Sequence, residues 1–209
     1  MTTKPKIAII LGTTRPTRFA DKPAEWLMNI AKARDDATYE IVDLRDYPMP
    51  FFEEAGSPMF VPPQNAVALA WGRKVAEFDG YIFVTAEYNH SMPAVLKNAL
   101  DYAYAEFGRK PATFVAYGGV GGARAVEQLR LVVAELHMTS LKHTVHIGAT
   151  EFVGMLMQGK SFADYPYLDD AASMMLDHLA WWTNTLRAGR ELAAVEPFDH
   201  QAALKAAGA

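Results

Sequence analysis

The chain has 209 residues, 51% of them hydrophobic and 21% charged, with a formal net charge of −4 and no cysteine. This length and balance are typical of one globular domain, and the lack of cysteine excludes thiolate nucleophiles, cysteine-ligated zinc, iron–sulfur clusters and disulfides. The sequence has no basic stripe for nucleic acid and no apolar run near the ~20 residues of a membrane span, so we expect a cytoplasmic protein with neither partner.

Short apolar runs alternate with stretches of helical periodicity along most of the chain. We predict strands at 7–11, 39–44, 81–85, 112–117 and 141–147. We predict helices at 23–34, 65–78, 93–104, 123–136 and 169–186, and long irregular segments at 45–63 and 148–167. This alternation predicts an α/β fold, a doubly wound five-stranded parallel sheet in three α/β/α layers with the flavodoxin-like order 2-1-3-4-5. The predicted single domain spans 1–190, followed by a C-terminal tail at 191–209.

Residues 12–19, GTTRPTRF, follow the first predicted strand. Threonine hydroxyls and backbone N–H groups before a helix suit an anion, and the two arginines can hold phosphate oxygens. The stretch has neither the Gly-Lys-Ser/Thr of a Walker loop nor the Gly-x-Gly-x-x-Gly of a Rossmann fold, so it favours a single terminal phosphate. A polar turn with solvated arginines is the alternative.

Residues 85–101, TAEYNHSMPAVLKNALD, follow the third predicted strand, which neighbours the first in the expected order. Tyr88 offers a flat face to a ring, and Asn89 offers a donor and an acceptor to the edge of a heterocycle. Capping of the next helix by Asn89 or Ser91 is an equally good interpretation of this stretch taken alone.

Residues 117–124, YGGVGGAR, follow the fourth predicted strand. Four glycines in five positions let backbone amides approach a ligand without hindrance from a Cβ atom. The alternative is a tight turn without a ligand. We expect all three stretches at one edge of the sheet, because the carboxyl ends of parallel strands lie together there.

Together the three stretches resemble the NADPH-dependent FMN reductase family of flavodoxin-like proteins. That family shows a Gly-Ser/Thr-x-Arg loop after strand one, a Pro-Glu-Tyr-Asn-x-Ser-x-Pro-Gly-x-Leu-Lys-Asn-Ala-x-Asp segment after strand three, and a glycine-rich turn after strand four. The chain departs from the middle motif at Ala86 and Ala94, where proline and glycine are usual. The resemblance covers about 6–147, and Ala86 is the departure nearest to the implied flavin pocket.

The resemblance implies a flavoprotein that holds FMN non-covalently, takes electrons from NAD(P)H and forms a homodimer or homotetramer. The residues that would hold the phosphate are Thr13, Arg15, Thr17, Arg18 and Phe19. The residues that would line the ribityl chain and isoalloxazine ring are Glu87, Tyr88, Asn89 and His90. The residues that would approach the pyrimidine edge of the ring are Gly118, Gly119 and Gly121.

The implied activity is that of an oxidoreductase whose flavin carries the chemistry, so no catalytic side chain is predicted. We expect a ping-pong transfer of hydride from NAD(P)H through FMN to a small-molecule acceptor, namely a quinone, azo, nitro, metal-oxyanion or flavin compound. The alternative is a non-catalytic FMN electron carrier or partner-binding protein. A serine hydrolase using Ser91 is more remote, because the Gly-x-Ser-x-Gly context is absent. His143 and His146 should face opposite sides of one strand, so no metal site is predicted.

Overall fold

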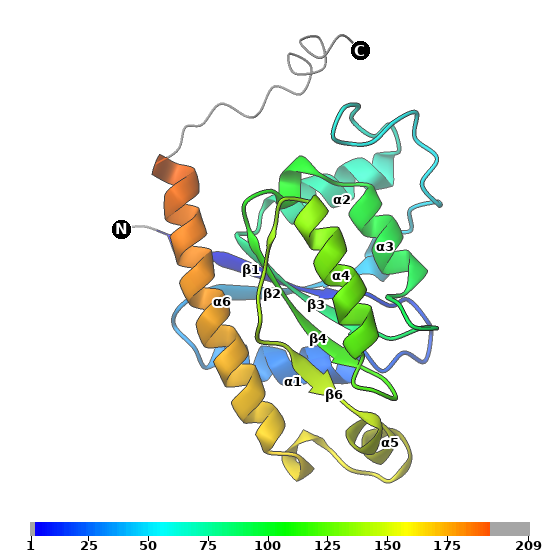
Figure 1. The fold of residues 1–209 in the computed structure, drawn as a ribbon, viewed down its shortest axis with the longest axis vertical. Coiled ribbons are helices and arrows are strands. Elements are labelled where there is room, and N and C mark those ends of the chain that lie inside the picture. The colour runs from blue at the N-terminus through cyan, green and yellow to red at the C-terminus, as the bar shows by residue number, and fades with distance from the viewer. Residues whose placement is uncertain (1–2, 193–209) are drawn as a thin grey trace.

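A computed structural model describes residues 3–192, which form three α/β/α layers around one parallel sheet (Figure 1). The strands are β1 (Lys6–Leu11), β2 (Thr38–Asp43), β3 (Gly80–Ala86), β4 (Pro111–Tyr117), β5 (Thr139–Ser140) and β6 (Val145–Ile147). The helices are α1 (Asp21–Lys32), α2 (Ala66–Ala76), α3 (Ala94–Asp101), α4 (Ala123–Glu135), α5 (Ala149–Met157) and α6 (Tyr167–Leu192), with 3-10 turns η1 (Leu44–Asp46), η2 (Ala105–Phe107) and η3 (Phe162–Asp164). The order β2-β1-β3-β4-β5 confirms the predicted topology.

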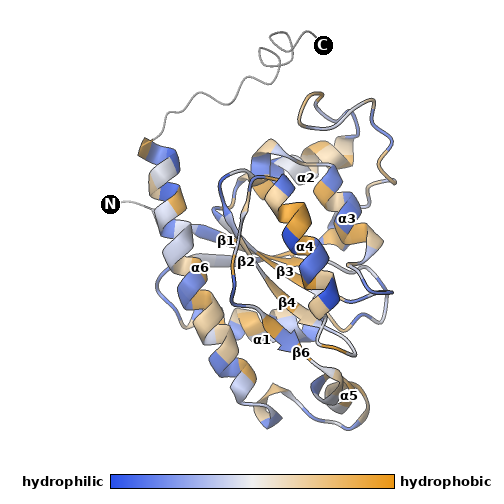
Figure 2. Cartoon of the chain, viewed as in Figure 1, coloured by the Kyte–Doolittle hydropathy of each residue, from blue (hydrophilic) through white to orange (hydrophobic). Residues whose placement is uncertain are grey.

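The sheet is covered on both faces, which explains why its central strands are continuous apolar runs. Every residue of β3 and β4 is buried. Helices α1 and α6 pack on one face, and α2, α3 and α4 pack on the other (Figure 1). Figure 2 shows hydrophobic residues along β3 and β4 and a mixture of hydrophobic and hydrophilic residues on α4 and α6, as expected for helices with one face in the core.

The fifth predicted strand, 141–147, is wrong in its extent, because only its last three residues, β6, pair with β4, and a separate two-residue strand, β5, pairs with β4 before the predicted segment begins. Side chains bind the carbonyls between the two strands. Arg130 donates to the Leu141 carbonyl at 2.6 Å, and the Thr113 hydroxyl donates to the His143 carbonyl at 2.6 Å. His143 therefore lies outside the strands, and its expected placement opposite His146 in one strand is also wrong.

The long irregular segment predicted at 148–167 is wrong as well, because it contains the helix α5. Gly154 lies within this helix, where a Cβ atom would overlap the Tyr165 hydroxyl oxygen. Phe152 and Met155 of α5 pack on the core that α1 and α6 cover, and this packing stabilises a short helix with a central glycine.

The last helix is longer than predicted and reaches Leu192. Of the predicted tail 191–209, only its first two residues belong to the part that the structure describes. No helix within 3–192 combines the length and the apolarity needed to cross a bilayer. Within the same range, histidine and acidic side chains form no group of three or more that could hold a metal ion.

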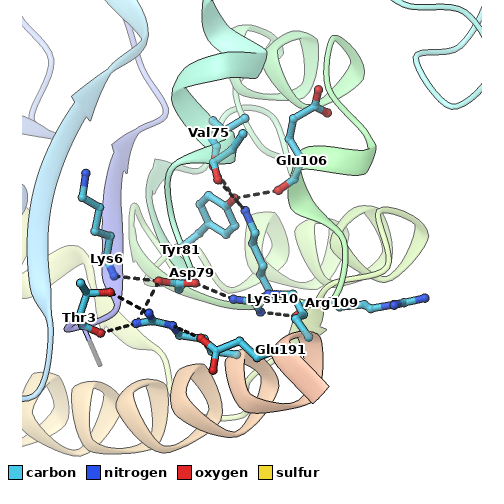
Figure 3. Close-up of polar contacts among 12 residues, drawn as sticks. Thr3, Lys6, Val75, Asp79, Tyr81, Glu106, Arg109, Lys110 and Glu191 are labelled. Atoms are coloured by element: carbon cyan, nitrogen blue, oxygen red, sulfur yellow. Dashed lines mark hydrogen bonds and ion pairs between the residues drawn. The ribbon is translucent and has the colours of Figure 1, made fainter. Parts of the chain in front are cut away.

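A buried lysine lies at the edge of the sheet where the parallel strands begin (Figure 3). Lys110 is 9% exposed, and its Nζ donates to the Ala76 carbonyl at 3.2 Å and to the Tyr81 hydroxyl at 3.2 Å. Tyr81 in turn donates its hydroxyl to the Val75 carbonyl at 2.7 Å. The ammonium group thus has polar partners but little water.

Burial lowers the pKa of Lys110 to about 8, and the nearby positive charge of Arg190 acts in the same direction. Asp79 and Glu106 oppose this shift. Asp79 is itself bound by Arg190 at 2.7 Å, an ion pair that connects the end of α6 to the residue before β3. The lysine is therefore neutral in the folded protein over a pH range in which it is charged in the unfolded chain.

This difference predicts a stability that rises with pH. Above pH 8 the folded state lacks the Lys110 proton, whereas the unfolded chain keeps it up to about pH 10.4, so unfolding takes up a proton in this window. Between pH 8.5 and 9.5, the free energy of unfolding in urea should therefore rise by about 1.4 kcal/mol more for the unmodified protein than for Lys110→Met. Lys32→Met, which changes an exposed lysine of α1, should show no such divergence. A constant difference between the protein and Lys110→Met would contradict the assignment.

Candidate functional site

The three loops predicted to form a site lie together at the carboxyl edge of the sheet, around a pocket of about 290 Å³. The pocket is lined by Arg15, Thr17, Arg18, Phe19, Ala86, Glu87, Tyr88, Tyr117, Gly118, Gly119, Phe152 and Leu156. Eight of the twelve predicted site residues are among them. Thr13 is a buried neighbour, whereas Asn89, His90 and Gly121 do not line this pocket.

Arg18 braces the 12–19 loop rather than facing solvent. Its guanidinium makes a bidentate pair with Asp43, with both distances 2.6 Å, and also binds Asp21. Its Nη1 donates to the Thr13 carbonyl at 2.7 Å. Burial alone would lower the pKa of Arg18, but the hydrogen bonds and negative charges of Asp43 and Asp21 raise it above its ordinary value. These bonds hold the loop in one conformation.

A second arginine, which the sequence did not indicate, braces the same loop from η1. Arg45 donates to the carbonyls of Thr14, Arg15 and Pro16, and its backbone N–H donates to Asp43 at 2.9 Å. The two arginines bind carbonyls of the loop, whereas several of its backbone N–H groups stay unpaired within the part of the chain that the structure describes. Among residues 3–192, none accepts a hydrogen bond from the backbone N–H of Thr14, Arg15 or Thr17.

Two further features favour an anion at this loop. The guanidinium of Arg15 is exposed, lines the pocket and has no ion-pair partner in 3–192. The Thr13 hydroxyl is buried and makes no hydrogen bond of ordinary geometry within the same part of the chain. A buried hydroxyl without a partner is unfavourable, so a bound oxygen would relieve its cost. Amides, a free guanidinium and this hydroxyl together form a cradle for a phosphate-like group.

The second loop makes a two-residue turn at its tip. Tyr88 and Ser91 pair in an antiparallel bridge, and the residues between them, Asn89 and His90, have φ of 47° and 75°. Such a tight turn requires positive φ at both central residues. The exposed tip therefore projects beyond the pocket, while Tyr88 stays in its lining.

Glu87 connects the second loop to the third. Its carboxylate is 5% exposed and accepts from Arg124 Nε at 2.6 Å and from the Arg124 backbone N–H at 3.2 Å. The N-cap residue of α4 is Gly122, which has no side chain to bind the first turn. Glu87 supplies this cap from a neighbouring loop, where the partial positive charge of a helix N-terminus favours a carboxylate.

Replacement of Glu87 by glutamine should therefore destabilise the protein by about 1–2 kcal/mol, because a neutral amide forms weaker hydrogen bonds to Arg124. Urea unfolding measures this loss. Glu127→Gln, at an exposed position of the same helix, is the matched control and should stay within about 0.5 kcal/mol of the unmodified protein. Equal stabilities of the two variants would contradict the capping role.

The third loop places its glycines in different environments. Gly121 and Gly122 have φ of +68° and are buried, and the Gly121 carbonyl lies 2.8 Å from His146 Nδ1. Gly119 is exposed in the pocket lining, and a Cβ atom there would meet nothing within 4 Å. The first two glycines are needed to form the turn, whereas Gly119 is a place where backbone is accessible to a ligand.

Four lining residues were not among the predicted site residues. Tyr117 immediately precedes the glycines, and its position at the end of β4 could have identified it. Ala86 was named only as a departure from the motif. Phe152 and Leu156 lie on α5, which the sequence did not predict, so no sequence signal placed them near the pocket. They give the cradle an apolar neighbour suited to a planar or aliphatic ligand group.

Comparison with known proteins gives consistent findings. Residues 5–151 match the family model described as NADPH-dependent FMN reductase. An NAD(P)H-dependent FMN reductase of Schizosaccharomyces pombe is 42% identical over 137 residues, 64% of this chain and 68% of the relative. A quinone reductase of Escherichia coli is 29% identical over 187 residues, 86% of this chain and 92% of the relative. The fold is similar to that of the flavoenzyme NAD(P)H:(acceptor) oxidoreductase FerB from Paracoccus denitrificans, with a TM-score of 0.65, 19% identity and coverage of 87% of this chain and 98% of that one.

Proposed function

Because the chain belongs to the NADPH-dependent FMN reductase family, we propose that it is an FMN-dependent NAD(P)H oxidoreductase that reduces small-molecule acceptors. The single observation that carries this proposal is the phosphate cradle of the 12–19 loop, which adjoins a pocket with aromatic walls. Its free amides, the exposed Arg15 guanidinium and the unpartnered Thr13 hydroxyl fit a terminal phosphate. Gly119 and Tyr88 fit the edge and the face of a flat ring.

In this proposal Arg15, Thr13 and Thr17 hold the phosphate, and Phe19 lines the pocket beside them. Glu87, Tyr88, Gly118, Gly119 and Gly121 surround the rest of FMN, with Asn89 and His90 at the exposed rim. Arg18 acts through the loop, because its guanidinium is already engaged by two carboxylates. Glu87 acts in the same indirect way through Arg124.

Bound FMN would supply the redox chemistry, accepting hydride from NAD(P)H and delivering electrons to a second substrate. The protein supplies binding, orientation and a partly apolar surrounding. We propose that donor and acceptor use this pocket in turn, which is a ping-pong order. Quinones are the acceptor class that we propose first, since one relative is named a quinone reductase and Phe152 and Leu156 make one wall apolar.

The spectrum of the purified protein tests the proposal. We expect it to bind FMN, to show the yellow flavin absorbance and to lose that absorbance when NADPH is added without an acceptor. Addition of a quinone should restore the colour. A protein that neither retains nor binds added FMN, and that does not oxidise NADPH, would overturn the proposal.

A non-catalytic FMN carrier is the second candidate, favoured by the same cradle. Steady NADPH consumption with a quinone separates the two, because a carrier needs a partner reductase to be reduced.

The serine hydrolase alternative predicts cleavage of a simple ester. Its support is weak, since the Ser91 backbone is engaged in the bridge with Tyr88 and the family is one of oxidoreductases.

The proposal includes a homodimer or homotetramer in the cytoplasm. The loop that follows η1 exposes large apolar side chains, with Phe51 80% exposed and Phe60 43% exposed. We propose that a second copy of the chain covers these exposed apolar side chains. Sedimentation equilibrium measures this directly, and a monomer at micromolar concentration would contradict it.

A further inference from the structure

We propose that Tyr117 is a ligand-contacting residue of the phosphate cradle, donating its phenol O–H to an oxygen of the phosphate. This inference rests on the proposed function, since it takes FMN as the ligand. It adds a residue that sets the preference of the site for a phosphorylated flavin over an unphosphorylated one. The argument starts from the position of Tyr117 in the sheet.

The carboxyl edge of the sheet brings Tyr117 and Thr13 close to one another. Tyr117, at the end of β4, pairs with Ala86 of β3, whose side chain is a single methyl group. Thr13 lies two residues beyond Leu11, the last residue of β1, which pairs with Val84 of β3. The Thr13 hydroxyl is close enough to the Tyr117 phenol to influence its pKa.

The small side chain of Ala86 leaves room for the Tyr117 ring to extend toward the 12–19 loop. The ring is held between two other aromatic rings. It meets Phe19 edge-on at 5.0 Å between centroids and stacks on Phe152 at 5.8 Å. Such contacts fix both the place and the tilt of the ring, so the phenol oxygen is directed before any ligand binds.

The phenol oxygen reaches the electropositive end of the pocket. It is close enough to the Thr13 hydroxyl to be influenced by it, although the pair does not meet the geometry of an ordinary hydrogen bond. Arg15 and Arg18 line the same pocket as Tyr117, and the Arg15 guanidinium has no ion-pair partner in 3–192. Two neighbouring hydroxyls and a guanidinium are therefore available at this end of the pocket. One anionic oxygen can accept hydrogen bonds from several donors, so a phosphate would satisfy all three.

The protonation state of the phenol is right for a donor. Burial raises the pKa of Tyr117 to about 12, while Thr13 and the two arginines act in the opposite direction. The group therefore keeps its proton throughout the physiological range. A neutral phenol can therefore donate to an anion without adding a further charge to the site when no ligand is bound.

The test compares FMN with riboflavin, which lacks only the phosphate. Flavin fluorescence quenching gives the affinity of the apoprotein for each. In Tyr117→Phe we expect about a tenfold loss of FMN affinity and riboflavin affinity within about twofold of the unmodified protein. The matched control is Tyr81→Phe, which removes a buried hydroxyl from the opposite end of the neighbouring strand and should change neither affinity.

A second variant keeps the test independent of one substitution. Thr13→Val removes the facing hydroxyl with little change in shape and should also weaken FMN more than riboflavin. The double variant should lose less than the product of the two single losses, because both hydroxyls act on one group. Full additivity would contradict a shared phosphate.

The outcomes separate this inference from the function on which it rests. An unmodified protein that binds FMN no better than riboflavin overturns the proposed function itself. An unmodified protein that prefers FMN, with the same preference in Tyr117→Phe, overturns only the role of Tyr117. Equal losses for both flavins in Tyr117→Phe also overturn it, since they would show that the ring packs against the flavin without contacting the phosphate.

Discussion

Replacement of Arg15 by alanine is expected to weaken FMN binding by about 1.5–3 kcal/mol, roughly ten- to a hundredfold in affinity, because a charge-assisted hydrogen bond to phosphate is lost. Arg15 is the arginine of its loop that is free to act in this way. The guanidinium of Arg18 is engaged by Asp43 and Asp21, whereas that of Arg15 is exposed and lines the pocket. The measurement is the dissociation constant of FMN, followed by fluorescence quenching.

Two comparisons make the Arg15→Ala result specific. Riboflavin affinity should change little, since riboflavin carries no phosphate for Arg15 to hold. Arg73→Ala, at an exposed arginine of α2, removes the same charge elsewhere on the surface and should leave both affinities unchanged. If Arg15→Ala binds FMN as tightly as the unmodified protein does, Arg15 is not a phosphate ligand and the loop is a solvated polar turn.

The fold could be predicted from the sequence because its main signals are local. Continuous apolar runs such as Tyr81–Val84 are typical of parallel strands covered on both faces. The fifth strand could not be placed in the same way. Carbonyls in its interruption accept hydrogen bonds from Arg130 and Thr113, which lie outside the segment, and nothing in 141–147 itself indicates these bonds.

The sequence predicts which loops form the candidate site, but it does not predict which contacts each residue makes there. Arg18 and Glu87 were expected beside a ligand because of their charge and place in the motif. In the structure both are paired within the protein, Arg18 with Asp43 and Glu87 with Arg124. Pairing of this kind depends on where a partner falls in three dimensions, and a motif of neighbouring residues contains no information about it.

The wall formed by α5 was missed for a related reason. A glycine in a sequence favours a loop. In the structure Gly154 instead lies within α5 and leaves space for the Tyr165 hydroxyl, which a Cβ atom at this position would overlap. A glycine required for close packing and a glycine required for a turn look alike in a single sequence, so Phe152 and Leu156 could not be assigned to the pocket in advance.

The glycine turn offers a prediction that separates these two kinds of requirement within one loop. Gly122→Ala should destabilise the protein by about 2–5 kcal/mol. The residue has φ of +68°, which costs about 1–2 kcal/mol for an alanine. Its Cβ atom would also lie 2.6 Å from the Ala116 Cβ and 2.9 Å from the Tyr117 backbone nitrogen, and relief of such contacts within a strand adds about 1–3 kcal/mol.

Gly119→Ala is the matched partner, three residues away in the same turn. Its Cβ atom would meet nothing within 4 Å, so unfolding in urea should give a stability within about 0.5 kcal/mol of the unmodified protein. If Gly119 lies against the flavin ring as proposed, the added methyl group should nevertheless weaken FMN and riboflavin alike, in contrast to the phosphate-specific loss in Arg15→Ala. Equal stability of the two glycine variants would contradict the steric argument, and undiminished flavin binding by Gly119→Ala would remove that residue from the ring site. One glycine would then be required by the backbone of the turn and the other by the ligand, which is a distinction that neither stability nor binding alone could establish.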